Sequence, residues 1–255
     1  MRSINGELAK LIPEPKYKLN TVGFFGASQS SGFSPSDISN LYIWFDMSNL
    51  ASITKDGSDR VSNIDNLEGT SARDAVQTTA GDQPLWESSQ QNSLDTVNFS
   101  GSRFMKSSSA LTTVTQPQTF FTVAKWVFTT DGLILDGHGA SNRINAFAHG
   151  STDNVFSMWE GTHLSSGTVS GMLNNFKQVT IVANTTSSAL RVAGSSENTG
   201  NIGTGSWDGF TLGSNNSDTV WWNDRMGEVI VYDKLLDAEE IGQVETYLAD
   251  KWNVS

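Results

Sequence analysis

The stretch "TFFTVAKWVF", from Thr119 to Phe128, decides the fold class. In an extended chain successive side chains point to opposite sides, so Phe120 and Trp126 lie on one face and Phe121 and Val123 on the other. Both faces are therefore largely apolar. This pattern predicts a central β-strand that is covered on both sides.

Other segments repeat the strand pattern along the chain. "KQVTIVANT" and "GEVIVYD" place β-branched residues between turn-forming residues, and shorter runs such as "GLILDG" and "FTLGS" follow at short intervals. Of 255 residues 37% are hydrophobic, which is enough for a large core, and only 17% are charged. We expect an all-β, two-sheet antiparallel sandwich over residues 34–255.

One helix is predicted near the end, in "LLDAEEIGQVETYLADKW". Its apolar residues recur at steps of three and four and form one stripe: Ile241, Val244, Leu248 and Trp252. Asp237 can cap the first turn, and Glu240 completes a capping box. We expect the stripe to pack on the sandwich rather than on a partner helix.

Residues 1–33 are expected to form an extended N-terminal arm and linker. Prolines bracket Glu14 in "IPEPKY", and "GFFGASQSSGF" is rich in small residues. Four basic residues against two acidic ones give the arm a net charge of +2. Since the whole chain has a net charge of −11, the remaining residues have a net charge of −13. The arm is either an unstructured terminus or a segment that docks on a partner. The candidate docking residues are Leu11, Ile12, Tyr17, Phe24 and Phe25.

Four stretches resemble the concanavalin A-like lectin/glucanase superfamily, in particular its laminin G-like jelly rolls of bacteriophage and bacterial surface proteins. They are "LYIWFDMSNLASITKDGSDRVSNIDN", "QPLWESSQQNSLDTVNFSGSRFM", "TFFTVAK", and "FTLGSNN" followed by "RMGEVIVYDKLLDAEEIGQVETYLADKW", and they span residues 35–253. The resemblance implies a jelly roll of two curved antiparallel sheets. It implies no activity, since that fold serves hydrolases, lectins and structural modules. After "DGSDRVS" the chain departs from the pattern, so no ligand on that turn is carried over.

Catalytic constellations are missing from the sequence. Retaining glucanases of this superfamily place carboxylates two residues apart on one strand, whereas the only such pair here, Asp237 and Glu239, lies at the predicted helix start. There is no Gly-x-Ser-x-Gly motif, no cysteine, and no zinc spacing among His138, His149 and His163. We therefore expect no enzyme, and glycoside hydrolysis ranks as the third function, open only through carboxylates from distant strands.

Asp46 follows an apolar run in "YIWFDMSNL". A carboxylate at the end of a strand most often accepts backbone N–H bonds in the turn that it starts, and we expect that structural role. The alternative is a calcium site, since some relatives use calcium, with Asn216 and Asp218 of the oxygen-rich "GSNNSDT" as further ligands. Calcium is the one cofactor that this pattern allows; otherwise we expect none.

Glycan binding needs aromatic faces beside amides and carboxylates. The best candidate is "TVWWND", in which adjacent tryptophans point to opposite sides of an extended chain. The candidate residues are Trp221, Trp222, Asn223, Asp224, Trp207 and Trp159. For each tryptophan the alternative is a place in the core.

We expect first a structural protein of a virion, as a bacteriophage capsid decoration, fibre or spike component. Its arm would attach to other virion proteins, and its lectin-like sandwich would face outward, with a homo-oligomer as one form. The alternative is a carbohydrate-binding module for host or environmental glycans, extracellular or on a cell surface. The net charge of −11 argues against nucleic acid, and no segment has the ~20 apolar residues of a membrane span. The first residues contain no signal-peptide run, so synthesis in a host cytoplasm is expected.

Overall fold

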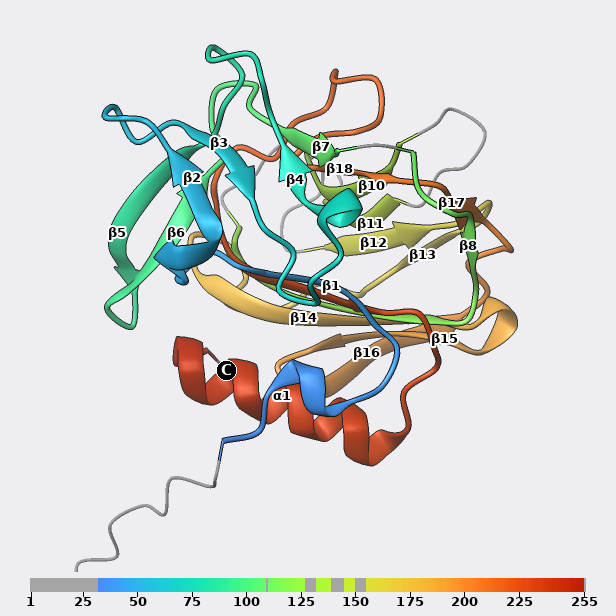
Figure 1. The fold of residues 1–255 in the computed structure, drawn as a ribbon. Coiled ribbons are helices and arrows are strands. Elements are labelled where there is room, and N and C mark those ends of the chain that lie inside the picture. The colour runs from blue at the N-terminus through green and yellow to red at the C-terminus, as the bar shows by residue number, and fades with distance from the viewer. Residues whose placement is uncertain (1–31, 109, 127–131, 139–144, 150–154, 255) are drawn as a thin grey trace, which may run out of the picture. The chain divides into compact units, whose positions relative to one another are not determined.

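The structure, a computed structural model, describes residues 32–108, 110–126, 132–138, 145–149 and 155–254. From Phe33 onward it forms two large antiparallel sheets and one C-terminal α-helix (Figure 1). This confirms the predicted all-β sandwich. The predicted arm, with Leu11, Ile12, Tyr17, Phe24 and Phe25, lies outside the described residues.

Sheet 1 has eight strands in the order β16-β15-β14-β9-β19-β6-β5, and β1 also pairs with β19. The strands are β1 (Leu41–Asp46), β5 (Leu85–Gln91), β6 (Leu94–Asn98), β9 (Gln118–Lys125), β14 (Phe176–Ala183), β15 (Ser188–Val192), β16 (Ser195–Gly200) and β19 (Arg225–Tyr232).

Sheet 2 has nine strands in the order β13-β12-β11-β10-β18-β7-β4-β3-β2. The strands are β2 (Ile53–Lys55), β3 (Val61–Ile64), β4 (Ala75–Val76), β7 (Met105–Ser107), β10 (Gly132–Gly137), β11 (Asn145–His149), β12 (Phe156–Trp159), β13 (His163–Ser165) and β18 (Phe210–Leu212). A separate pair joins β8 (Val114–Thr115) and β17 (Ser206–Trp207). Single 3-10 turns are η1 (Pro35–Asp37), η2 (Leu50–Ser52), η3 (Ser71–Arg73) and η4 (Thr185–Ser187).

The strand β9 occupies the central place that its sequence predicts. It lies between β14 and β19, and its residues Gln118 to Ala124 are buried. Phe120 belongs to the core between the two sheets, while Phe121 belongs to the layer beneath the helix. Alternate side chains of β9 therefore belong to two different hydrophobic cores. The strand ends at Lys125, so Trp126 of the predicted segment does not extend it, and residues 127–128 lie outside the described residues.

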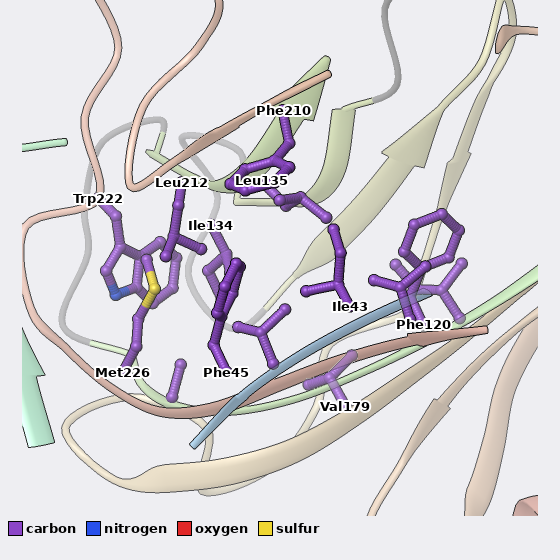
Figure 2. Close-up of a cluster of buried hydrophobic side chains, with 14 of the residues drawn as sticks. Ile43, Phe45, Phe120, Ile134, Leu135, Val179, Phe210, Leu212, Trp222 and Met226 are labelled. Carbon is purple, nitrogen blue, oxygen red and sulfur yellow. The ribbon is translucent and has the colours of Figure 1, made fainter. Parts of the chain in front are cut away.

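The main core fills the space between the two sheets. Figure 2 shows Phe45, Phe120 and Val179 of sheet 1 facing Leu135, Phe210 and Leu212 of sheet 2. All of these side chains are almost completely buried. Burial of large apolar side chains from both sheets is the main force that holds the sandwich together.

The helix α1 (Ala238–Trp252) covers the face of sheet 1 that points away from sheet 2 (Figure 1). Its stripe is buried at Val244, Leu248 and Trp252, as predicted. The side chain of Asp237 accepts hydrogen bonds from the backbone N–H groups of Glu239 and Glu240. The Glu240 side chain accepts from the Asp237 N–H at 3.1 Å, so the predicted capping box is confirmed. Among the described residues, no helix is long and apolar enough to cross a membrane.

A buried carboxylate, Glu228 of β19, joins α1 to sheet 1. It is completely buried and accepts four hydrogen bonds: from Trp44 Nε1 at 2.7 Å, Tyr247 Oη at 2.9 Å, Lys251 Nζ at 2.8 Å and Trp252 Nε1 at 2.7 Å. Burial raises the pKa of Glu228, and the ammonium of Lys251 opposes that rise. Three of the four donors belong to α1, so this one group fixes the helix on the sheet.

The C-terminal end of α1 is held by its neighbours on two sides. A Cβ atom on Gly227 would lie 2.8 Å from the ring of Trp252, so the indole can rest on β19 only because that residue is glycine. From the β5–β6 hairpin, Gln91 Nε2 donates to the Trp252 carbonyl at 2.8 Å and Asn92 Nδ2 to the Lys251 carbonyl at 2.8 Å. These bonds satisfy carbonyls that have no partner inside the helix.

The Glu228→Ala substitution should lower the free energy of unfolding by about 3 kcal/mol or more, because Lys251 and three neutral donors lose their buried acceptor. Chemical denaturation monitored by tryptophan fluorescence measures this loss. The exposed helix residue Gln243, changed to alanine, is the matched control and should alter stability by less than about 0.5 kcal/mol. A loss below about 1 kcal/mol in Glu228→Ala would contradict the anchoring role.

Candidate functional site

A polar hollow of about 200 Å³ opens on the helix side of sheet 1, beyond the C-terminal end of α1. Its lining comes from β5, β9, the start of β14 with the loop before it, and β19: Gln90, Gln91, Lys125, Asn174, Asn175, Phe176 and Arg225. We call this site the hollow. Amides, two cations and one aromatic ring therefore line the same small space.

Strand register brings the two cations together. Phe121 and Val123 face α1. Because side chains alternate along a strand, Lys125, the last residue of β9, points to the same side. Arg225 is the first residue of β19, and its neighbour Met226 pairs with the residue before Lys125. The two side chains therefore meet at one end of the sheet.

Two carboxylates hold the cations of the hollow in place. Arg225 Nε donates to Glu87 Oε2 at 2.6 Å, and its Nη1 donates to Asp224 Oδ1 at 3.0 Å. The Lys125 ammonium lies 3.9 Å from Asp224 Oδ2. Burial raises the pKa of Asp224, while the Arg225 backbone N–H and both cations lower it. Two positive and two negative groups leave the hollow close to neutral, and the lysine retains donors for a ligand.

The amide side chains supply acceptors. Gln91 Nε2 donates to the end of α1, Gln90 Nε2 donates to the Ser88 carbonyl at 2.8 Å, and Asn175 Nδ2 donates to the Gly171 carbonyl at 3.1 Å. The N–H groups of Gln91 and Asn175 each donate to two backbone carbonyls, whereas Gln90 uses one of its two N–H groups. The side-chain carbonyl oxygens of these amides are therefore the main groups that remain to accept. Phe176, which is half-buried and pairs with Lys125, adds an apolar surface.

Two of the tryptophans that the sequence predicts as glycan-binding residues are buried in the structure, which corrects that prediction. Trp222 is 0% exposed and Trp207 is 1% exposed, so neither offers a face to a sugar. Both fill the main core, where Figure 2 places Trp222 beside Leu212 and Met226. The ring of Trp222 meets the ring of Trp126 edge-on at 4.8 Å, and the backbone N–H of Trp126 donates to the backbone carbonyl of Asn175 at 3.2 Å. Trp222 thus supports the hollow from behind.

The remaining predicted glycan residues are placed differently. Asp224 is buried and holds both cations of the hollow. Trp221 is half-buried, and Asn223 is exposed and accepts a bond from Ser100 Oγ through its carbonyl. Trp159 is half-buried on β12, in the other sheet, with its ring 6.4 Å from that of His163. The structure does not bring these three into the hollow lining.

The calcium candidates do not form one site. Asp46 accepts the Ser48 N–H at 3.0 Å, as expected for a turn, and pairs with Lys251 Nζ at 2.7 Å. Asp218 is bound at 2.9 Å by Lys106 of sheet 2, and the backbone N–H of Asn216 donates to Asp136. Lysine ammonium groups therefore occupy the carboxylates, and Asp46 ends β1 whereas Asn216 and Asp218 lie in the loop between β18 and β19. Over the described parts of the chain, no group of three His, Asp or Glu residues is placed to hold a metal ion.

One carboxylate pair from distant strands does come together. Asp46 and Glu228 are direct partners across β1 and β19. Lys251 Nζ binds both, at 2.7 and 2.8 Å, and Glu228 lies completely buried beneath α1. The pair belongs to the helix anchor.

Glu160, which directly follows β12, is a buried acid that the sequence analysis missed. It is 1% exposed, its Oε1 atom has no hydrogen-bond partner, and Gln116 Nε2 donates to Oε2. Burial raises its pKa to about 8, and the Gln116 bond lowers it. The acid is therefore protonated at neutral pH.

No protein-family model matches the chain, and no curated protein matches it. Solved structures share its fold. Domain 4 of AbnA, a GH43 extracellular arabinanase from Geobacillus stearothermophilus in complex with arabinotriose, has a TM-score of 0.52 and 11% identity; the match covers 82% of this chain and 98% of that domain. Trypanosoma rangeli sialidase in complex with the inhibitor DANA has a TM-score of 0.53 and 11% identity, covering 88% of this chain and 36% of the sialidase.

The same sialidase in complex with sialic acid has a TM-score of 0.52 at 12% identity, with 86% of this chain and 34% of the sialidase covered. The chain thus spans about one third of the sialidase chain and almost all of the arabinanase domain. Its structural neighbours are β-sandwich domains of glycoside hydrolase and sialidase type. At these identities the likeness shows the fold alone.

Stability should depend on pH through Glu160. The folded state keeps its proton up to about pH 8, whereas the unfolded state releases it near 4.5. This contribution to stability is complete below about pH 4.5 and falls as pH rises to about 8, by up to about 1.4 kcal/mol per pH unit. Unfolding of the wild type and of Glu160→Gln, measured between these limits, should show a shallower slope for the variant. Equal slopes would contradict the raised pKa.

Proposed function

We propose that this domain binds carbohydrate in the hollow and does not cleave it. The observation that carries the proposal is the donor and acceptor set around Lys125 and Arg225. A sugar hydroxyl donates and accepts at once, so it matches amide oxygens that lie beside a lysine with unused donors. The ring of Phe176 offers a surface for sugar C–H groups.

The nearly balanced charge of the hollow favours a neutral glycan. Glu87 and Asp224 compensate Arg225 and Lys125, so an anionic sugar would meet no net positive field. The carboxylates are also fixed by Arg225, which keeps the donors in place before a ligand arrives. Preorganised polar groups bind at a smaller cost in conformational entropy.

The non-enzymatic part of the proposal is supported by the role of the carboxylates. Glycoside hydrolysis needs two carboxyl groups on either side of one bond. Here Glu87 and Asp224 are held by Arg225, and Asp46 and Glu228 are held by Lys251. Both pairs of carboxylates therefore form ion pairs that stabilise the fold.

We also propose that the chain is a concanavalin A-like jelly roll of the laminin G-like kind. The antiparallel sheets and the arabinanase and sialidase neighbours support this assignment. The first of these neighbours holds arabinotriose in its structure, which fits a carbohydrate-binding fold.

The setting that we propose for this binding is the surface of a bacteriophage particle, with residues 1–33 as the attachment segment. The contrast between a net charge of +2 in that segment and −13 in the remainder supports the division of roles. Deletion of residues 1–33 should leave a folded domain that no longer joins the particle. If the shortened chain is incorporated into the particle as well as the full chain, the proposed attachment is wrong, while the proposed glycan binding is unaffected.

A glycan array probed with the full chain should give hits among neutral glycans. The Lys125→Ala substitution should weaken the best hit at least about tenfold, because it removes the ammonium donor without breaking a close ion pair. Lys106→Ala, on sheet 2, is the matched control and should bind like the wild type. An array without hits, or equal binding by Lys125→Ala and the wild type, would contradict the proposal.

A further inference from the structure

A second hollow, of about 330 Å³, runs between one side of α1, the strand β14 and the turn of the β15–β16 hairpin. We call it the helix groove. Small residues line most of it, among them Gly194 of the hairpin and Gly242 and Ala249 of the helix. Backbone and short side chains leave room for an occupant there. A Cβ atom placed on Gly242 would meet no atom within 4 Å.

The floor of the helix groove carries a polar group that has no partner. Gln178 of β14 lines the groove and is 1% exposed, and its Nε2 atom makes no hydrogen bond. Val179 faces the main core, so Gln178 faces α1 and the groove. Leaving a buried amide unsatisfied costs stability, and such groups in native proteins point to a partner outside the chain.

The helix groove and the hollow are neighbours around the end of α1. Phe176 lines the hollow and Gln178 lines the groove, two residues apart on the same face of β14, which separates them by about 7 Å. Val254, just after α1, lines the groove, while Gln91 of the hollow donates to the Trp252 carbonyl. The hollow and the groove therefore lie next to each other along β14, with Phe176 between them.

The groove, like the hollow, has its charges paired. Glu245 of α1 accepts from Arg191 Nε at 2.8 Å and from its Nη2 at 2.9 Å. This bidentate pair leaves no free charge for an ionic partner. A neutral ligand with apolar faces and hydroxyl acceptors suits both the small residues and the Gln178 donor.

We propose that the helix groove is the second part of the glycan site, so that the ligand is an oligosaccharide of several units rather than a single sugar. This inference rests on the proposed carbohydrate binding in the hollow. One end of the oligosaccharide contacts Lys125 and Asn175. The other end packs its C–H faces on Gly194 and Gly242, and one of its hydroxyl groups accepts a hydrogen bond from Gln178 Nε2.

The test compares chain lengths on groove variants of the full chain. The probe is an array that carries mono-, di-, tetra- and hexasaccharides of linear arabinan, glucan and mannan. Gly242→Leu fills the groove, and it should preserve or raise the melting temperature because leucine favours a helix more than glycine does. Gln178→Leu removes the unpaired amide, and it should also keep or raise that temperature. Gln243→Leu, on the exposed side of the same helix, is the matched control.

In the wild type and in Gln243→Leu, the hexasaccharide should bind at least about tenfold more tightly than the disaccharide. Gly242→Leu and Gln178→Leu should lose this gain and keep the disaccharide affinity. Two results would overturn the proposed role of the groove and leave the proposed site in the hollow. The first is binding that depends on Lys125 but is equally tight for all chain lengths. The second is a gain in affinity with chain length that both groove variants retain. Absence of all binding would overturn both.

Discussion

The interaction on which the rest of the structure depends is the burial of Glu228 beneath α1. A completely buried carboxylate is tolerated there because two indoles, one phenol and one ammonium donate to it. The same contacts fix the angle and position of the helix on sheet 1. Gly227 completes the arrangement, since any side chain at that position would displace the ring of Trp252.

The site follows from this helix position. Once α1 is anchored, its last carbonyls receive Gln91 and Asn92, and the β5–β6 hairpin then forms a wall of the hollow. The opposite side of the helix forms a wall of the groove with β14 and the β15–β16 turn. Both spaces therefore belong to the junction between helix and sheet, and the binding that we propose there would rely on a rigid scaffold.

The elements of the fold could be predicted from the sequence because they depend on local patterns. A strand that is apolar on both faces, a capped helix with one apolar stripe, and an acid that starts a turn are all confirmed at β9, α1 and Asp46. The site could not be predicted, since Lys125, Asn174 and Arg225 come from distant segments and meet only through strand register. Asp224 of "TVWWND" pairs with both cations of the hollow, but which of the two adjacent tryptophans enters the core is set by tertiary packing. One signal was available for the anchor: Glu228 is a lone acid within an apolar strand.

A crystal structure of the full chain, grown with the oligosaccharide that binds it most tightly, tests the central claim most directly. We predict a sugar ring in contact with Lys125 and Asn175, and a chain that continues past Phe176 toward Gln178, with Glu228 and α1 unmoved. A sugar bound instead at Trp159 and His163 on sheet 2, or across Asp46 and Glu228 after displacement of α1, would contradict it.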